Sequence, residues 1–259
     1  MFGFLTAVGF LTSMPPLLRR NADGGDVARS FSYFPLVGAA LGLIAAAVDL
    51  ALRQIFPIAA ASALVLALLV LMTGALHLDG FIDCCDGLFG GKEPARRLEI
   101  MRDSRIGSFG AVGVCVLLIA KYAALISLPI AWRLPILVTF PAVGRWAMVY
   151  AAVSFPPGRA DGLGSGVKAQ LGGGQLIGAT LIAAALCYAA MGARGILALF
   201  CAWVVTYLAV RYTLRKIPGL TGDTYGAINE LVEVSALYGL PALILIPLGA
   251  SLDPILLVR

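Results

Sequence analysis

Long, almost uncharged apolar stretches are the feature that most limits what this chain can fold into. Of its 259 residues, 60% are hydrophobic and 13% are charged, whereas soluble domains usually carry about 25% charged residues. So few charges cannot cover a soluble fold of this size, and the abundance of apolar side chains excludes disorder. We therefore predict an all-α, polytopic integral membrane protein with about seven transmembrane helices, in which residues 1–259 form a single catalytic domain.

The apolar stretches can be placed individually, because a transmembrane helix needs roughly 20 apolar residues. A run at 2–14 is too short to span and predicts a re-entrant or interfacial helix at the N-terminus. The predicted spans are 34–52, 57–76, 108–130, 134–153, 175–192, 195–213 and 235–250. The long polar segments between them are 77–107, 154–174 and 214–233. The Gly-rich residues 158–174 either close over a substrate or form a flexible link.

Basic residues are distributed unevenly between the two sets of alternate loops. Thirteen of the nineteen Lys and Arg residues fall in the set that contains the long polar segments, and four fall in the other set. Because cytoplasmic loops carry the excess of Lys and Arg, the long polar segments are expected on the cytoplasmic side. No basic segment interleaved with aromatic residues is present, so a nucleic-acid partner is not expected.

The sequence HLDGFIDCCDGLFGG at 77–91 contains three regularly spaced carboxylates. Asp79, Asp83 and Asp86 are spaced i, i+4 and i+7, which places them within about 60° on one face of a helix. Three ionised carboxylates repel one another unless a cation lies between them, and ligands that are all oxygen favour Mg²⁺. The segment therefore predicts a Mg²⁺ site at these three residues, and the alternative is a solvated acidic helix.

The next segment, residues 92–110, is basic. Asp103 within it is a candidate further metal ligand, and Ser104 is a candidate hydrogen-bond donor to phosphate. Carboxylates followed directly by cations are what metal-assisted phosphoryl transfer requires. The alternative is a positively charged anchor that only fixes topology. The predicted anion-binding residues are Arg96, Arg97, Arg102 and Arg105.

A second polar cluster, residues 220–233, lies near the C-terminus. Asp223 is either a helix cap or part of the site, and Glu230 needs a polar partner beside the membrane. His77, the only histidine, is either a hydrogen-bond donor near Asp79 or a satisfied interfacial residue.

Two cations are predicted to lie inside the membrane. Lys121 and Arg145 fall within spans three and four, where an isolated charge is costly. We therefore expect both to face a polar cavity beneath the aspartates and to bind substrate there.

Four motifs resemble those of the cobalamin-5'-phosphate synthase (adenosylcobinamide-GDP ribazoletransferase) family. They are HLDGFIDCCDG at 77–87, RRLEIMRDSRIGSFG at 96–110, FPLVGAALG at 34–42 and TGDTYGAINE at 221–230. The resemblance extends essentially end to end. It implies that a ribose hydroxyl of α-ribazole, or of its 5'-phosphate, attacks the phosphate of adenosylcobinamide-GDP and that GMP leaves.

The resemblance also implies the components of the reaction. Mg²⁺ on the three aspartates would bridge the pyrophosphate, nearby cations would stabilise GMP as it leaves, and an aspartate or Glu230 would accept the proton. We expect the protein in the bacterial cytoplasmic (inner) membrane, with the site on the cytoplasmic side. The sequence leaves open whether the protein forms a homo-oligomer. One rival is a CDP-alcohol phosphotransferase acting on lipid, whose motif matches only at Asp83, Asp86 and Gly87. The other is a secondary transporter.

Overall fold

The computed structural model describes residues 2–14, 23–158 and 170–245, and these residues form helices and their connections. One isolated bridge, between Pro157 and Leu220, ties two connecting segments together, and the predicted all-α class is confirmed. The helices are α1 (Phe2–Leu11), α2 (Gly24–Ser30), η1 (Phe31–Tyr33), α3 (Phe34–Leu52), α4 (Ile58–Met72), α5 (Leu76–Cys85), η2 (Asp86–Gly90), α6 (Pro94–Ile100), α7 (Ser108–Ile126), η3 (Ile130–Trp132), α8 (Arg133–Ser154), α10 (Gly173–Met191), α11 (Ala193–Leu214) and α12 (Gly222–Ile244).

Within these described ranges, six helical stretches are long and apolar enough to cross a membrane. The bent pair of α4 with α5 and η2 adds a seventh crossing if it counts as one span. The ten residues of α1 are too few to span, as predicted. The multi-pass membrane class is therefore confirmed. The six stretches are 24–52, 108–126, 130–154, 173–191, 193–214 and 222–244.

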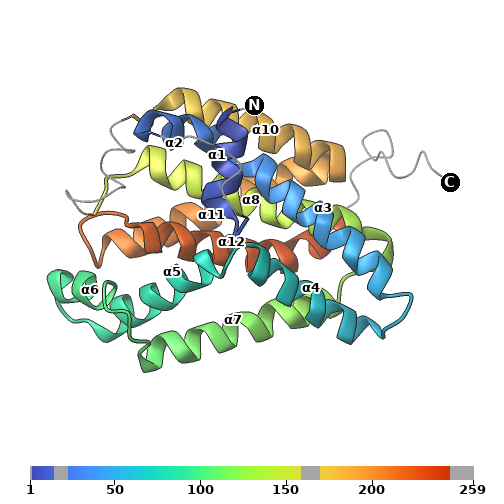
Figure 1. The fold of residues 1–259 in the computed structure, drawn as a ribbon, viewed down its shortest axis with the longest axis horizontal. Coiled ribbons are helices and arrows are strands. Elements are labelled where there is room, and N and C mark those ends of the chain that lie inside the picture. The colour runs from blue at the N-terminus through green and yellow to red at the C-terminus, as the bar shows by residue number, and fades with distance from the viewer. Residues whose placement is uncertain (1, 15–22, 159–169, 246–259) are drawn as a thin grey trace.

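The long helices lie side by side along the horizontal direction of Figure 1. One end of the molecule, which we call the basic end, contains α6 and the connections 91–107 and 215–221. The connections 53–57 and 127–132 lie at the opposite end. This separation agrees with the alternation of basic and non-basic loops in the sequence.

Helix α8 is the most buried of the candidate spans and packs closely against α3. A Cβ atom at Gly38 would lie 2.3 Å from the carbonyl oxygen of Pro141, and one at Gly42 would lie 2.2 Å from that of Leu137. Only glycine fits at these two positions, because any side chain would force the helices apart. The motif FPLVGAALG therefore has a packing role along most of its length.

The predicted second span, 57–76, is wrong at its end. Helix α4 stops at Met72, and the chain bends by 90° into α5. Gly74 and Ala75 both adopt left-handed backbone conformations, each with φ of 58°. Ser13 donates its hydroxyl to the carbonyl of Leu71 at 2.8 Å and its backbone N–H to that of Met72 at 2.9 Å. The Leu71 carbonyl also accepts the N–H of Gly74 at 3.1 Å, so that Ser13 mainly provides a partner for the Met72 carbonyl at the break.

The predicted last span, 235–250, is wrong at its start, and its residues 246–250 lie outside the described part of the chain. Helix α12 begins at Gly222, so most of the polar segment 214–233 is helical and belongs to the span. Thr221 caps the helix by accepting a hydrogen bond from the N–H of Thr224. Glu230 and Glu233 are therefore buried inside the bundle rather than placed in a loop before it.

Candidate active site

Helices α5 and α12 cross in close contact at two glycines. A Cβ atom at Gly80 would lie 2.7 Å from the carbonyl oxygen of Asp223, and one at Gly226 would lie 3.1 Å from that of His77. Because there is no side chain between the backbones, residues from the two helices that are distant in sequence line a common cavity.

This cavity, which we call the α5–α12 cavity, has a volume of about 200 Å³. Asp79 and Asp223 both line it, so the structure brings together one residue from each predicted acidic segment. Asp79 is exposed, and Asp223 is half-buried and accepts a hydrogen bond from the Thr221 hydroxyl at 3.1 Å. Thr221 is thus the N-cap of α12, whereas Asp223 lines the cavity. The remaining lining comes largely from Phe10, Phe31, Phe34, Leu76, Met148 and Tyr225.

The three predicted metal ligands have different surroundings. Asp83 is half-buried in the last turns of α5. Asp86 is buried, and its two carboxylate oxygens accept hydrogen bonds from the backbone N–H groups of Gly107 and Gly110, each at 2.8 Å. Asp86 thus caps the N-terminus of α7. Among the described residues, no three His, Cys, Asp or Glu side chains form a group suited to a metal ion.

Replacing Asp86 by alanine is expected to destabilise the protein by about 1 kcal/mol or somewhat more. The variant leaves the amides of Gly107 and Gly110 at the start of α7 without their acceptor, and that of Gly110 is buried. Thermal unfolding in detergent measures the effect, and Asp86→Asn, which keeps one acceptor oxygen, should lose less. Equal melting temperatures for wild type and Asp86→Ala would contradict this capping role.

The basic segment divides into structural and exposed arginines. Arg97 donates to the carbonyl of Gly91 at 3.0 Å and to that of Lys216 at 2.8 Å, and so joins two connections at the basic end. Arg96 forms an exposed ion pair with Glu99 at 2.7 Å. Arg102, Ser104 and Arg105 are exposed. Their anion-binding role stays a prediction, and the exposed members are the ones that a phosphate can reach.

Asp103 forms an ion pair with Arg105 in the same connection. The Arg105 guanidinium bonds both carboxylate oxygens, at 2.6 Å in the shortest contact. The side-chain hydrogen bond from Arg105 lowers the pKa of Asp103 to about 2. A carboxylate with so low a pKa is a poor general base near neutral pH, so its predicted catalytic role is limited to charge or ligation.

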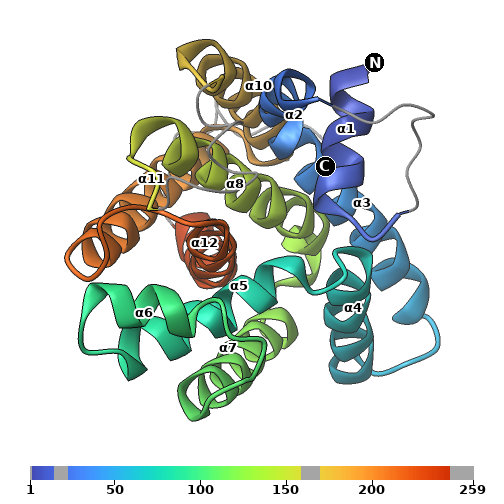
Figure 2. The same cartoon turned by 60° about the vertical axis from the view of Figure 1, so that its left-hand side comes forward.

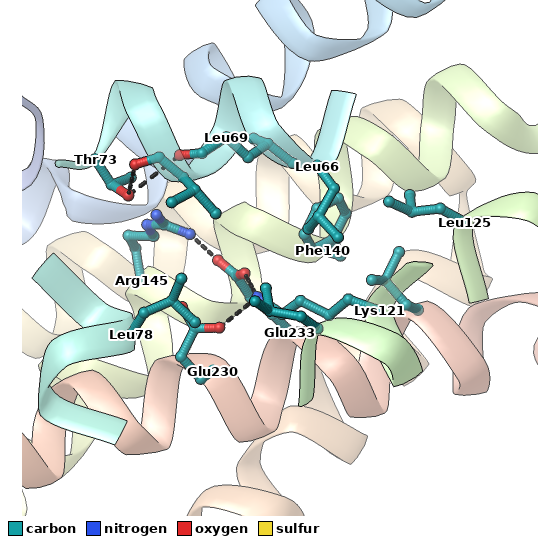
Figure 3. A pocket seen from close by; sticks show the side chains of 13 residues that line it. Leu66, Leu69, Thr73, Leu78, Lys121, Leu125, Phe140, Arg145, Glu230 and Glu233 are labelled. Atoms are coloured by element: carbon teal, nitrogen blue, oxygen red, sulfur yellow. Dashed lines mark hydrogen bonds and ion pairs between the residues drawn. The ribbon is translucent and has the colours of Figure 1, made fainter. Parts of the chain in front are cut away.

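Lys121 and Arg145 meet two glutamates inside the bundle (Figure 3). The Lys121 ammonium contacts Glu230 at 2.5 Å and Glu233 at 2.6 Å, and Arg145 forms an ion pair with Glu233. All four side chains are buried. Asn229 donates to Glu233 at 3.1 Å. These charges therefore face one another rather than lipid, as the cost of isolated charges in a membrane requires.

The cavity beside this ion cluster is small, about 30 Å³. That is room for water but not for a corrinoid or a nucleotide. Direct binding of substrate by Lys121, Arg145 and Glu230 stays a prediction. In the structure each of these groups has an oppositely charged partner, so the cluster as a whole is close to neutral.

Sequence reasoning missed two parts of this region. Glu233 was not among the predicted site residues, although two cations inside spans call for two carboxylates as partners. The wall formed by Phe10, Phe31 and Phe34 was also missed, and only the motif beginning at Phe34 pointed to it. His77 is not interfacial: it is 2% exposed, and among the described residues its Nε2 atom has no hydrogen-bond partner.

The fold and cavity define a class: a multi-pass helical membrane protein with an acidic cavity between two packed helices and a basic end. The profile of the cobalamin-5-phosphate synthase family matches residues 3–241. The chain belongs to this family, and the resemblance inferred from its motifs is confirmed. No solved structure matches it.

Curated relatives carry the name adenosylcobinamide-GDP ribazoletransferase. The protein from Desulforamulus reducens is 42% identical, over 90% of this chain and 93% of its own length. Those from Roseiflexus and Geotalea daltonii are 39% and 38% identical, over 89% and 93% of this chain and 86% and 97% of their own lengths. The prediction of a membrane transferase of cobalamin biosynthesis is thus confirmed at the level of the family.

Proposed function

We propose that this protein is an adenosylcobinamide-GDP ribazoletransferase that attaches α-ribazole, or its 5'-phosphate, to the corrinoid and releases GMP. The observation that carries the proposal is the α5–α12 cavity, which is lined by Asp79 and Asp223 from two of the motifs that resemble the family's. Both substrates are soluble and charged or polar, whereas the cavity is built from membrane helices. The site therefore lies where a membrane bundle opens toward water, and we place it on the cytoplasmic side because of the basic end.

Two of the three predicted aspartates, rather than all three, fit a Mg²⁺ site. Mg²⁺ is usually held by one or two protein carboxylates and completes its coordination with water and substrate phosphate. Asp79 and Asp83, one helical turn apart on α5, supply two such carboxylates. Asp86 is occupied in capping α7. When bound, the ion would neutralise charge on the pyrophosphate oxygens.

The proton of the attacking hydroxyl needs an acceptor inside the cavity. Asp223 lies on the opposite helix from Asp79, and its hydrogen bond from Thr221 fixes the orientation of the carboxylate. Glu230 is a less suitable base, because it lies outside this cavity and its carboxylate is 2.5 Å from the Lys121 ammonium. We therefore assign Asp223 as general base: the ribose oxygen bonds to phosphorus, its proton passes to Asp223, and the bond from phosphorus to the GMP oxygen breaks.

The leaving group acquires negative charge as that bond breaks. The exposed cations at the basic end are Arg96, Arg102 and Arg105, and we assign them to this charge. Arginine matches phosphate oxygens in bidentate geometry, and hence these residues would stabilise the departing GMP. Arg97 instead holds the backbone of the same region in place.

The experiment is a turnover assay with purified protein in lipid vesicles. With adenosylcobinamide-GDP, α-ribazole and Mg²⁺, we expect one GMP and one cobalamin product per turnover. Removing divalent cations with EDTA should abolish turnover, and added Mg²⁺ should restore it. Transfer from a CDP-activated lipid with no GMP release from the corrinoid would overturn the proposal in favour of the lipid enzyme. Full turnover in EDTA would remove the metal from the mechanism.

A further inference from the structure

Three phenylalanine rings form one wall of the α5–α12 cavity, and they stack on one another. The ring centroids of Phe31 and Phe34 are 4.3 Å apart, and Phe10 lies 5.7 Å from Phe34, with interplanar angles of 25° and 21°. Phe31 and Phe34 are buried, whereas Phe10 is 46% exposed. The stack therefore ends on a ring that is only partly covered by protein, and such rings offer a planar base a surface for stacking.

The size of the cavity limits what can enter it. Drug-sized ligands usually occupy pockets of about 300–1,000 Å³, and this cavity has about 200 Å³. A corrin macrocycle does not fit, but a single fused-ring base does. The corrinoid must therefore lie outside, and the cavity receives part of a nucleoside.

The chemistry of the wall decides between the two nucleosides in the reaction. Apart from Asp79 and Asp223, whose carboxylates we assign to the metal and to the proton, the wall is built largely from apolar side chains such as Leu76 and Met148. Guanine carries several donors and acceptors that such a wall would leave unpaired, which is unfavourable. The base of α-ribazole is mostly apolar and has a single ring nitrogen acceptor, so it suits this wall better.

We propose that the α5–α12 cavity binds the heterocyclic base of the acceptor nucleoside, stacked on Phe10. The ribose then lies toward Asp79 and Asp223, where its hydroxyl is deprotonated. This inference rests on the proposed function and adds the substrate-binding residues that select the acceptor. The N-terminal helix α1, too short to cross the membrane, has a role in binding because it supplies Phe10.

Phe10→Ala tests the stacking, because Phe10 is largely exposed and its loss should not unfold the protein. We expect the KM for α-ribazole to rise about tenfold or more, with an unchanged KM for adenosylcobinamide-GDP and a similar kcat. Phe10→Trp should restore the KM for α-ribazole. Phe200→Ala, which removes another exposed ring on α11, is the matched control and should change neither KM.

Calorimetric binding of α-ribazole to the protein without corrinoid tests the stacking by a route independent of turnover. The affinity of Phe10→Ala should fall about tenfold or more, whereas Phe10→Trp and Phe200→Ala should bind α-ribazole as wild type does. The melting temperature of Phe10→Ala should stay close to that of wild type, because Phe10 is 46% exposed. Wild-type affinity in folded Phe10→Ala would overturn the inference.

The outcomes separate this inference from the proposed function. If wild type forms no cobalamin product from the two substrates, the proposed function fails. If wild type is active and Phe10→Ala keeps the wild-type KM for α-ribazole, or raises only the KM for adenosylcobinamide-GDP, the base does not bind in this cavity. The inference is then wrong while the function stands.

Discussion

Asp79→Asn should release GMP at a rate lower than wild type by on the order of 10²-fold or more. Asparagine keeps the size of the side chain, so helix α5 and its packing against α12 stay intact. What is lost is the negative charge that would hold the proposed Mg²⁺ ion beside the phosphate. Asp223→Asn should lower the rate by about 10²–10⁴-fold, the usual contribution of a general base.

A single-turnover assay at saturating concentrations of both substrates measures these losses. Glu99→Gln is the matched control, because it removes an exposed carboxylate on α6 whose ion-pair partner among the described residues is Arg96. Its rate should stay close to wild type. A rate within threefold of wild type in folded Asp79→Asn would show that this carboxylate has no part in catalysis.

Lys121→Leu should lower the free energy of unfolding by about 3–5 kcal/mol. Lys121 contacts both Glu230 and Glu233, and its removal leaves buried negative charge with only Arg145 as partner. A lysine facing lipid would behave in the opposite way, because its replacement by leucine would remove a cost. The sign of the change therefore distinguishes the two locations.

Denaturant unfolding in detergent micelles provides the measurement. Adding Glu230→Gln to Lys121→Leu should recover part of the loss, because the double variant restores charge balance. Lys92→Leu, at an exposed position, is the control and should change stability by no more than about 0.5 kcal/mol. A Lys121→Leu variant as stable as wild type, or more stable, would contradict the buried ion cluster.

Most of the membrane architecture could be predicted because apolar length alone determines a span. Helix α3 covers the predicted 34–52, and α7, α8, α10 and α11 begin and end within a few residues of their predicted limits. The break at Gly74 and Ala75 could not be predicted in this way, since the apolar run continues through it. It depends on Ser13, whose contact is distant in sequence.

The types of residue at the candidate site could be predicted, but the groups that each of them contacts could not. The spacing of Asp79, Asp83 and Asp86 is right for one helical face. The carboxylate of Asp86, however, accepts hydrogen bonds from the amides of Gly107 and Gly110. That contact depends on where α7 begins in space. Glu233 fell at the end of the predicted polar segment 214–233, and only the three-dimensional arrangement provides Lys121 and Arg145 to compensate its charge inside the bundle. Residues 159–169, within the predicted Gly-rich segment, lie outside the described residues.

The central claim is that ribazole transfer takes place in the α5–α12 cavity. Electron cryo-microscopy of Asp223→Asn in lipid nanodiscs, with α-ribazole, adenosylcobinamide-GDP and Mg²⁺, tests it most directly, because this variant should bind both substrates without turning them over. We predict density for the base against Phe10 and Phe34, with the ribose beside Asp79 and the corrin outside the cavity at the basic end. Density for the nucleoside at another surface of the bundle, with the α5–α12 cavity empty, would contradict the account.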